Sequence, residues 1–287
     1  MKIGFLGYGE AARAFHEGLT RHDLTFITYD IQLAHDNDEM RAAMQANGAE
    51  IAQSISGLGE ADWIFSAVTA DQSLIAVEPL LPNLRQGQVL IDINSVSPGR
   101  KKETAAAVEA AGAGYLDMAV MAPVHPKKHQ TPVLLAGQLA DRLLPELSAL
   151  GFCAEIAGKE PGAATAIKMV RSLFVKGLEA IAVEALLAAR ASGCYEEILS
   201  SLSASYPGLG WPQFAEYQFE RTTRHGGRRA AEMRECATTL NALGLRGALA
   251  GEIAAVQECM GACGPGPAMD LDRTISRVLA LRLKADE

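Results

Sequence analysis

The first eighteen residues, MKIGFLGYGEAARAFHEG, constrain the fold of this chain more than any other segment. A short apolar run ends at Leu6 and leads into the turn Gly7-Tyr8-Gly9-Glu10-Ala11-Ala12, and a helical pattern follows at once. This is the strand, glycine turn and helix of a dinucleotide-binding fold, with alanine at the third glycine position. Gly7 permits the tight turn, and Gly9 lets a pyrophosphate approach the backbone. The N-terminus of the helix then directs free N–H groups at the phosphates.

A second apolar run, Leu24 to Tyr29, ends in Asp30. The fold places there the carboxylate that binds the adenosine ribose hydroxyls, and a carboxylate repels a 2′-phosphate, so the sequence favours NAD over NADP. The alternative is an ordinary strand–helix turn in which Asp30 merely ends a strand. The predicted cofactor-binding residues are Gly7, Tyr8, Gly9, Glu10, Ala11, Asp30, Val68, Thr69 and Asn94.

Bulk properties narrow the class of protein. A chain of 287 residues with 49% hydrophobic residues suggests one large domain or two ordinary ones. Its net charge of −8 argues against nucleic acid or an anionic membrane as partner. No apolar run reaches the roughly twenty residues that span a bilayer, and no signal peptide precedes the first strand, so we expect a cytoplasmic protein. The five cysteines have no metal-site spacing, and no metal is predicted.

The chain changes character near residue 158. Strand-like runs at 63–69, 89–93, 115–120, 133–136 and 153–156 alternate with helical stretches. This alternation predicts an α/β Rossmann domain over residues 1–157, with a mostly parallel, doubly wound sheet. Residues 158–287 are predicted to form an all-α domain, which is entered by a long interdomain helix over 163–192. Breaks between its later helices are expected at Pro207-Gly208, Gly226-Gly227, Gly244 and Gly264-Pro265-Gly266-Pro267.

The start of the long helix carries the pattern Gly158-x3-Gly162-x5-Lys168-x3-Ser172. Lys168 and Ser172 are four residues apart and therefore share one helical face. A half-buried lysine has a lowered pKa and can act as a general base near neutral pH. The alternative is a surface lysine whose ammonium group reaches the solvent.

Four motifs occur in order along the chain: GFLGYGEAA, Asp92-x2-Ser95-x2-Pro98, Asp117-Met118-Ala119-Val120-Met121-Ala122-Pro123, and the Gly158 to Lys168 pattern. In this order they resemble those of the β-hydroxyacid dehydrogenases, the group of 3-hydroxyisobutyrate dehydrogenase and 6-phosphogluconate dehydrogenase. The resemblance implies that Lys168 is the catalytic lysine, acting as general acid and base in the reversible oxidation of a 3-hydroxy acid by NAD. It implies a structural role for Asp117, a part for the helical domain over residues 158–287 in substrate binding and oligomerisation, and a homodimer or homotetramer formed through that domain.

The chain departs from this family at two places. The substrate loop, Ser-Gly-Gly in the family, reads Met121-Ala122-Pro123, and the asparagine four residues after the lysine is replaced by Ser172. The segment KMVRS resembles a divergent branch with diverse substrates, which admits a β-hydroxy amino acid such as phenylserine as well as a 3-hydroxy acid. The predicted substrate-binding residues are Ser95, Met121, Ala122, Pro123, His125, Arg171, Ser172 and Arg229.

The group that holds the substrate carboxylate stays open. Arg171 lies one turn from Lys168, and His125 lies on the modified loop, where it can equally be a turn histidine between two prolines. Arg228 and Arg229 end a basic cluster and are candidates to bind the substrate carboxylate or the cofactor; the alternative is that this cluster is a solvated helix start. Two other functions are compatible with a dinucleotide-binding fold. An NADP-dependent imine or keto reductase of this fold usually replaces the lysine, and a non-catalytic NAD-binding regulatory protein has no need of Lys168.

Overall fold

The computed structural model describes residues 1–20, 23–35, 38–267 and 269–285. Contacts within the chain divide it into two compact units, Met1–Met169 (unit 1) and Val170–Glu287 (unit 2). The division falls inside the long helix, so the first turns of that helix pack with the sheet. The domain boundary expected after residue 157 stays a prediction.

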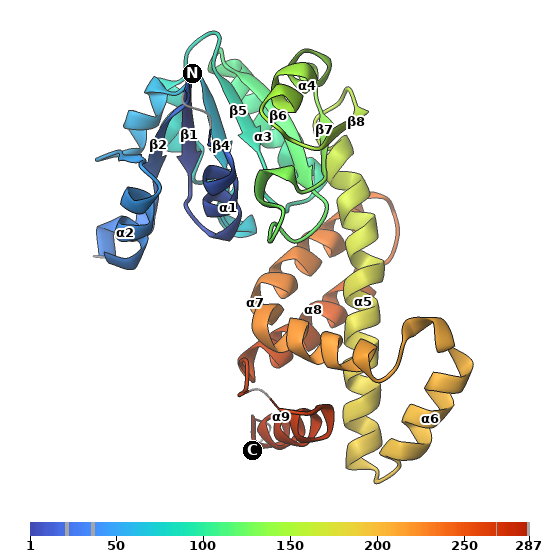
Figure 1. Ribbon diagram of the computed structural model, residues 1–287. Helices are drawn as coiled ribbons and strands as arrows, with labels where there is room; N and C mark the ends of the chain where they lie inside the picture. Colours follow the sequence, from blue (N-terminus) through green and yellow to red (C-terminus); the bar gives the residue numbers. More distant parts are fainter. Residues whose placement is uncertain (21–22, 36–37, 268, 286–287) are drawn as a thin grey trace. The chain divides into compact units, whose positions relative to one another are not determined.

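Unit 1 contains an eight-stranded sheet. Its strands lie in the order β3-β2-β1-β4-β5-β6-β7-β8 (Figure 1). Strand β6 pairs with β7 in antiparallel orientation, and the other pairs are parallel. The strands are β1 (Lys2–Leu6), β2 (Thr25–Tyr29), β3 (Glu50–Ile51), β4 (Trp63–Ser66), β5 (Val89–Asp92), β6 (Gly114–Val120), β7 (Val133–Ala136) and β8 (Ala154–Gly158). The predicted Rossmann fold is therefore confirmed.

Alternating residues of the central strands enter two separate cores. Phe5, Phe65 and Ile91 face one core, to which α1 (Glu10–Gly18), α2 (Asp38–Ala46) and α4 (Ala140–Ala149) contribute. Leu6, Ile64 and Leu90 face the other, which is covered by α3 (Pro98–Ala110) and the 3₁₀ segments η2 (Ile55–Glu60) and η4 (Glu78–Asn83). Since both faces of the strands are apolar, the sheet is buried on both sides, as parallel sheets require. The remaining 3₁₀ segments of unit 1 are η1 (Ile31–His35), η3 (Ala70–Gln72) and η5 (Lys128–Gln130).

The rest of the chain is helical, as predicted. Helix α5 (Ala163–Ala191) begins in unit 1 and continues into unit 2. It is followed by α6 (Tyr195–Ser205), η6 (Pro207–Leu209), α7 (Gln213–Ala242), α8 (Ala248–Ala262) and α9 (Leu271–Ala285). The expected breaks near Pro207, Gly244 and Gly264 are confirmed. Across the part of the chain that the structure describes, no helix combines the length and the hydropathy needed to cross a membrane.

The break expected at Gly226-Gly227 is wrong, because α7 runs through both residues without interruption (Figure 1). A Cβ atom on Gly226 would lie 2.1 Å from the carbonyl oxygen of Gln257 and 2.5 Å from the backbone nitrogen of Gly261, both in α8. Gly226 therefore allows the backbones of α7 and α8 to approach closely. From the sequence alone, a glycine that serves such a close approach cannot be told apart from a glycine that ends a helix.

Candidate active site

One row of residues crosses the sheet of unit 1 and fixes the position of the site. Tyr29 pairs with Leu6, Leu6 with Ser66, Ser66 with Asp92, and Asp92 with Asp117. Because β2, β1, β4 and β5 are parallel, the segments that follow them open at the same edge. The strand order reverses between β1 and β4, and ligands bind at such a switch point outside the carboxyl ends of the strands.

The glycine turn after β1 has the geometry that a dinucleotide needs. Gly7 has φ +85°, and a Cβ atom there would lie 2.6 Å from the carbonyl oxygen of Ala67. Gly9 is exposed, and a Cβ atom on it would meet nothing within 4 Å. Helix α1 starts at the next residue, so the first amides of the helix, from Glu10 and Ala11, lie beside this open backbone. The turn thus fits a pyrophosphate group.

Asp30 holds the glycine turn against the end of β2. Its carboxylate accepts hydrogen bonds from the backbone N–H groups of Tyr8 at 2.7 Å and of Gln32 at 2.9 Å. The carboxylate is half-buried, so its two oxygens keep room for further donors. This is the arrangement in which a ribose diol can be bound next to the turn.

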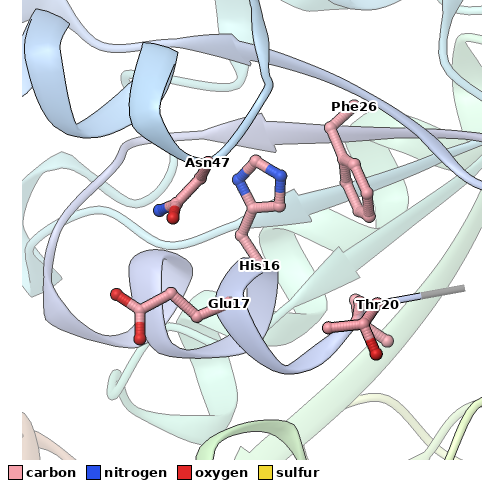
Figure 2. Close-up of a pocket in the computed structure, with 6 residues that line it drawn as sticks. His16, Glu17, Thr20, Phe26 and Asn47 are labelled. Carbon is pink, nitrogen blue, oxygen red and sulfur yellow. The ribbon is translucent and has the colours of Figure 1, made fainter.

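The side chain of Tyr8 lies behind the turn rather than in the cofactor site. It is fully buried, its hydroxyl accepts from Asn47 Nδ2 at 3.0 Å, and the hydroxyl and His16 Nδ1 share a hydrogen bond of 2.7 Å. Figure 2 shows the imidazole between Asn47 and Phe26, in a pocket of about 290 Å³ that is lined by His16, Glu17, Leu19, Thr20, Phe26 and Asn47. Burial lowers the pKa of His16 to about 4, so the ring is neutral at physiological pH. Tyr8 can therefore contact a cofactor through its backbone alone.

Asn94 joins the two loops that follow β4 and β5. Its Oδ1 accepts from the backbone N–H of Val68 at 2.7 Å, and its Nδ2 donates to Ser66 Oγ at 2.9 Å. Val68 is half-buried and Thr69 is exposed beside it. The structure thus brings these predicted cofactor residues to the edge that also carries the glycine turn.

The second and fourth motifs meet at this edge. Lys168 Nζ donates to Ser95 Oγ at 2.5 Å, and both side chains are half-buried. The contact depends on close packing, because Gly162 has φ +93° and a Cβ atom on it would lie 2.8 Å from the carbonyl oxygen of Pro98. Lys168 is therefore tied to the end of β5 rather than extended into the solvent.

The modified loop after β6 lies partly against the start of α5. Met121 packs on a small core formed by Ala119, Ala136 and Ala164. Of these, Ala164 lies on α5, one turn before Lys168. Ala122, Pro123 and His125 are exposed. The first residue of the loop is thus placed next to the lysine helix, and the other predicted residues lie at the surface.

The remaining predicted substrate residues belong to unit 2. Arg171 is exposed on α5, and Ser172 Oγ accepts from Lys176 Nζ at 3.2 Å. Arg229 is 8% exposed and forms an ion pair with Glu179. The interpretation of its basic cluster as a solvated helix start is wrong, because Arg229 lies in the middle of α7 and on its buried face.

Two buried residues that support this edge, Lys101 and Tyr115, were not predicted from the sequence, and Asp92 was named there only as part of a motif. Lys101 Nζ lies 2.9 Å from Asp92 Oδ1 and 3.3 Å from Asp117 Oδ1. A signal existed in the sequence. Lys101 sits in the first turn of a helix that directly follows the strand ending in Asp92, where a cation and a carboxylate can meet.

Two family models match the chain. A model described as the NAD binding domain of 6-phosphogluconate dehydrogenase matches residues 2–158. A second, described as Domain of unknown function (DUF1932), matches residues 189–260.

Solved structures and curated enzymes resemble the chain over most of its length. A conserved hypothetical protein from Sinorhizobium meliloti 1021 is 33% identical, with a TM-score of 0.75 over 98% of this chain and 96% of that one. The 2-(hydroxymethyl)glutarate dehydrogenase of Eubacterium barkeri is 24% identical over 76% of this chain and 73% of that enzyme. The 3-hydroxyisobutyrate dehydrogenase of Mycobacterium tuberculosis, with L-serine, shares the fold at 16% identity, with a TM-score of 0.73 over 96% and 98% of the two chains.

The model of the NAD-binding domain covers more than half of the chain, and its residues are those that build the glycine turn, Asp30 and the strand-end edge. The predicted resemblance is therefore confirmed, and the chain belongs to the family that shares the NAD-binding domain of 6-phosphogluconate dehydrogenase, the β-hydroxyacid dehydrogenases.

Proposed function

We propose that this protein is an NAD-dependent dehydrogenase that oxidises the hydroxyl group of a 3-hydroxy acid or a β-hydroxy amino acid. The observation that carries the proposal is the contact between Lys168 and Ser95, at the same sheet edge as the glycine turn. The names of the relatives support the substrate class. 2-(Hydroxymethyl)glutarate and 3-hydroxyisobutyrate carry the hydroxyl on the carbon β to a carboxylate, and L-serine is a β-hydroxy amino acid.

Lys168 supplies the proton chemistry in this proposal. As a neutral amine, Nζ accepts the proton of the substrate hydroxyl, and in the reverse direction the ammonium returns it. Ser95 accepts a hydrogen bond from Nζ, which fixes the direction of the amine and leaves the serine O–H free to donate to the substrate. When bound, the nicotinamide ring supplies the hydride acceptor.

Arg171 is our candidate for the group that binds the substrate carboxylate. It follows Lys168 by three residues on one helix, so the two side chains leave the helix about 60° apart, and it is exposed. Arg229 is less suited, because Glu179 already neutralises its guanidinium group. We expect Arg171→Leu to raise KM for the acid with a smaller effect on kcat.

Asp30 supports NAD as the cofactor. The negatively charged 2′-phosphate of NADP would lie against the Asp30 carboxylate, which binds the glycine turn, and the two groups would repel each other. The residues that follow, Ile31 and Gln32, are uncharged. Steady-state kinetics with both cofactors test this point, and a wild-type preference for NADPH would overturn it.

The decisive experiment uses a panel of 3-hydroxy acids and β-hydroxy amino acids, including phenylserine, with NADH absorbance as the readout. We expect turnover in the wild type and a loss of about 10²- to 10⁴-fold in kcat for Lys168→Ala, with an unchanged Kd for NAD. Lys159→Ala, an exposed lysine just before the helix, is the matched control. Full activity in Lys168→Ala would refute the proposal, as would NAD binding without turnover of any hydroxy compound. Reduction of imines with NADPH alone would favour the reductase alternative.

We also propose that the protein forms a homodimer or homotetramer through unit 2. Val170, Phe174 and Ile181 are 55%, 72% and 66% exposed, and their spacing of four and seven residues places them on one face of α5. A second copy offers the same apolar face, and a two-fold axis pairs the two faces. We expect Phe174→Glu to lower the molar mass that light scattering measures in solution, whereas an unchanged mass would contradict this interface.

A further inference from the structure

A fully buried cluster of charged and polar side chains lies beneath the candidate active site, within unit 1. Lys101 comes from α3, Asp92 from the end of β5, and Tyr115 and Asp117 from β6; none of them is more than 1% exposed. Lys101 Nζ contacts Asp92 Oδ1 at 2.9 Å and Asp117 Oδ1 at 3.3 Å, and it donates to the backbone oxygen of Asp92 at 2.7 Å. One ammonium group thus lies within ion-pair distance of carboxylates on two neighbouring strands.

The two carboxylates outnumber the cation, and neutral donors complete the cluster. Tyr115 Oη donates to Asp92 Oδ2 at 2.8 Å, and the backbone N–H of Asn94 donates to Asp92 Oδ1 at 2.9 Å. Burial raises the pKa of Asp117, and the nearby Asp92 carboxylate adds to this, while Lys101 opposes both. The ion pair with Lys101 therefore opposes the protonation of Asp117 that burial and the neighbouring Asp92 favour.

Each carboxylate anchors one of the two segments that carry the Lys168–Ser95 contact. Asp92 lies three residues before Ser95, and Lys101 binds both its backbone and its side chain. Asp117 Oδ2 accepts from the backbone N–H groups of Gly162 at 3.1 Å and Thr165 at 3.2 Å, which belong to the start of α5. Thr165 is one turn before Lys168. The carboxylate of Asp117 thus caps the lysine helix from a neighbouring strand.

We propose that Lys101 is a positioning residue for Lys168: by bridging Asp92 and Asp117, it sets the start of α5 relative to the end of β5 and so aligns the Lys168 amine with Ser95. The catalytic side of this inference rests on the proposed function. The claim that Lys101 aligns the Lys168 amine with Ser95 does not depend on that function, because this contact is present in the protein without substrate or cofactor. Without Lys101, two buried carboxylates face each other, and Asp117 either takes up a proton or turns away from the amides of α5.

Three variants test the inference in the full-length protein. Lys101→Met keeps the length of the side chain and removes its charge. The double variant Lys101→Met/Asp117→Asn also removes one carboxylate charge, so the net charge of the cluster stays as in the wild type and folding is protected. Lys102→Met is the matched control, since Lys102 is the next residue on α3 and is exposed.

The first readout does not need activity. After reductive ¹³C-methylation, the dimethyl-lysine signal of Lys168, assigned by its absence in Lys168→Arg, is titrated with pH. We expect the pKa of Lys168 to differ from wild type in Lys101→Met and in the double variant, and to be unchanged in Lys102→Met. The second readout is kinetic: kcat falls about 10- to 100-fold in both Lys101 variants, with an unchanged Kd for NAD.

The outcomes separate the two proposals. A changed Lys168 titration in a protein that turns over no hydroxy acid would support the positioning role and refute the proposed reaction. A wild-type titration in both Lys101 variants would overturn the positioning role even if the enzyme is a dehydrogenase. Loss of kcat with an unchanged titration would likewise overturn it, because the effect would not pass through Lys168.

Discussion

Each of the two units buries an ionic network, and the two networks are built differently. In unit 1, Lys101 faces two carboxylates, and backbone amides of strand ends and of the start of α5 complete the set. In unit 2, each carboxylate has its own cation: Arg229 pairs with Glu179, and Lys176 pairs with Glu232 at 2.7 Å. The network of unit 1 fixes the backbone, whereas that of unit 2 holds three helices together through side chains.

This difference follows from the secondary structure. Aligned strands bring their ends into one row, so a side chain there can bind the free amides of a neighbouring loop or helix start. The amides in the middle of α5, α7 and α8 are already used within the helices, so a buried charge must find another side chain. Gln257 Nε2, for example, donates to the same Glu179 carboxylate at 3.0 Å. We therefore expect unit 2 to be most sensitive to the loss of one partner of a buried ion pair such as Arg229 and Glu179.

The largest expected effect tests that point. Arg229→Met leaves the Glu179 carboxylate buried without its cation, so we expect the free energy of unfolding of unit 2 to fall by about 3 to 5 kcal/mol. The protein has two tryptophans, and Trp211 in a Trp63→Phe background reports on unit 2 during denaturant unfolding.

Two controls make this prediction specific. Arg234→Met, on the same helix, breaks the exposed pair with Glu258 and costs at most about 1 kcal/mol. Arg229→Met/Glu179→Met removes both charges and recovers most of the loss. If Arg229→Met lowers the unfolding free energy no more than Arg234→Met does, the ion pair between Arg229 and Glu179 contributes no more to stability than an exposed pair.

The next prediction concerns unit 1 and its pH dependence. His16 is 3% exposed and has a pKa of about 4, against 6.5 for the free side chain. The unfolded chain therefore binds a proton at this residue as the pH falls through 6.5, while the folded chain does so only near pH 4. The stability of unit 1 is complete above pH 6.5 and falls by up to about 3 kcal/mol toward pH 4, at 1.36 kcal/mol for each pKa unit.

Trp63 fluorescence in a Trp211→Phe background measures this loss. We expect His16→Asn to flatten the pH dependence of the unfolding midpoint of unit 1, and His125→Asn, on the exposed loop, to leave it as in the wild type. An equal slope in His16→Asn and wild type would show that another group drives the loss. The pH dependence of the unfolding midpoint of unit 2, measured by Trp211 fluorescence, should be the same in His16→Asn as in the wild type.

Much of unit 1 could be predicted from the sequence because its features are local. The glycine turn, Asp30 and the motif around Ser95 each follow directly after an apolar strand, and parallel strands bring such positions to one edge. The family resemblance singled out Lys168 and the motif that contains Ser95, but the contact between the two side chains was not predicted. The burial of the Tyr8 side chain was missed, because its partners come from separate places in the chain, His16 from α1 and Asn47 from the turn after α2.

The polar contacts of unit 2 could not be predicted in the same way. Helical periodicity shows which residues share a face, but it does not show which helix that face meets. Arg229 was therefore interpreted as a ligand of the substrate or as a surface residue, and its partner Glu179 lies fifty residues away on α5. Lys101 was overlooked for a related reason, since it stands in the charged run from Arg100 to Glu103, and lysines usually lie at the surface.

The smallest expected effect separates two adjacent glycines of α7. In Gly226→Ala the new methyl group meets the backbone of Gln257 and Gly261 in α8, and backbone cannot move aside as a side chain can. We expect the unfolding free energy of unit 2 to fall by about 1 to 3 kcal/mol, as for overpacked cores. In Gly227→Ala the methyl group meets nothing within 4 Å, so the higher helix propensity of alanine raises the unfolding free energy by up to about 1 kcal/mol. The two variants have the same composition and differ by one position, so opposite signs in the Trp211 unfolding curves can come only from the crossing of α7 and α8. A rise in both variants would mean that helix propensity, rather than this close approach, determines the stability of unit 2 at these two positions.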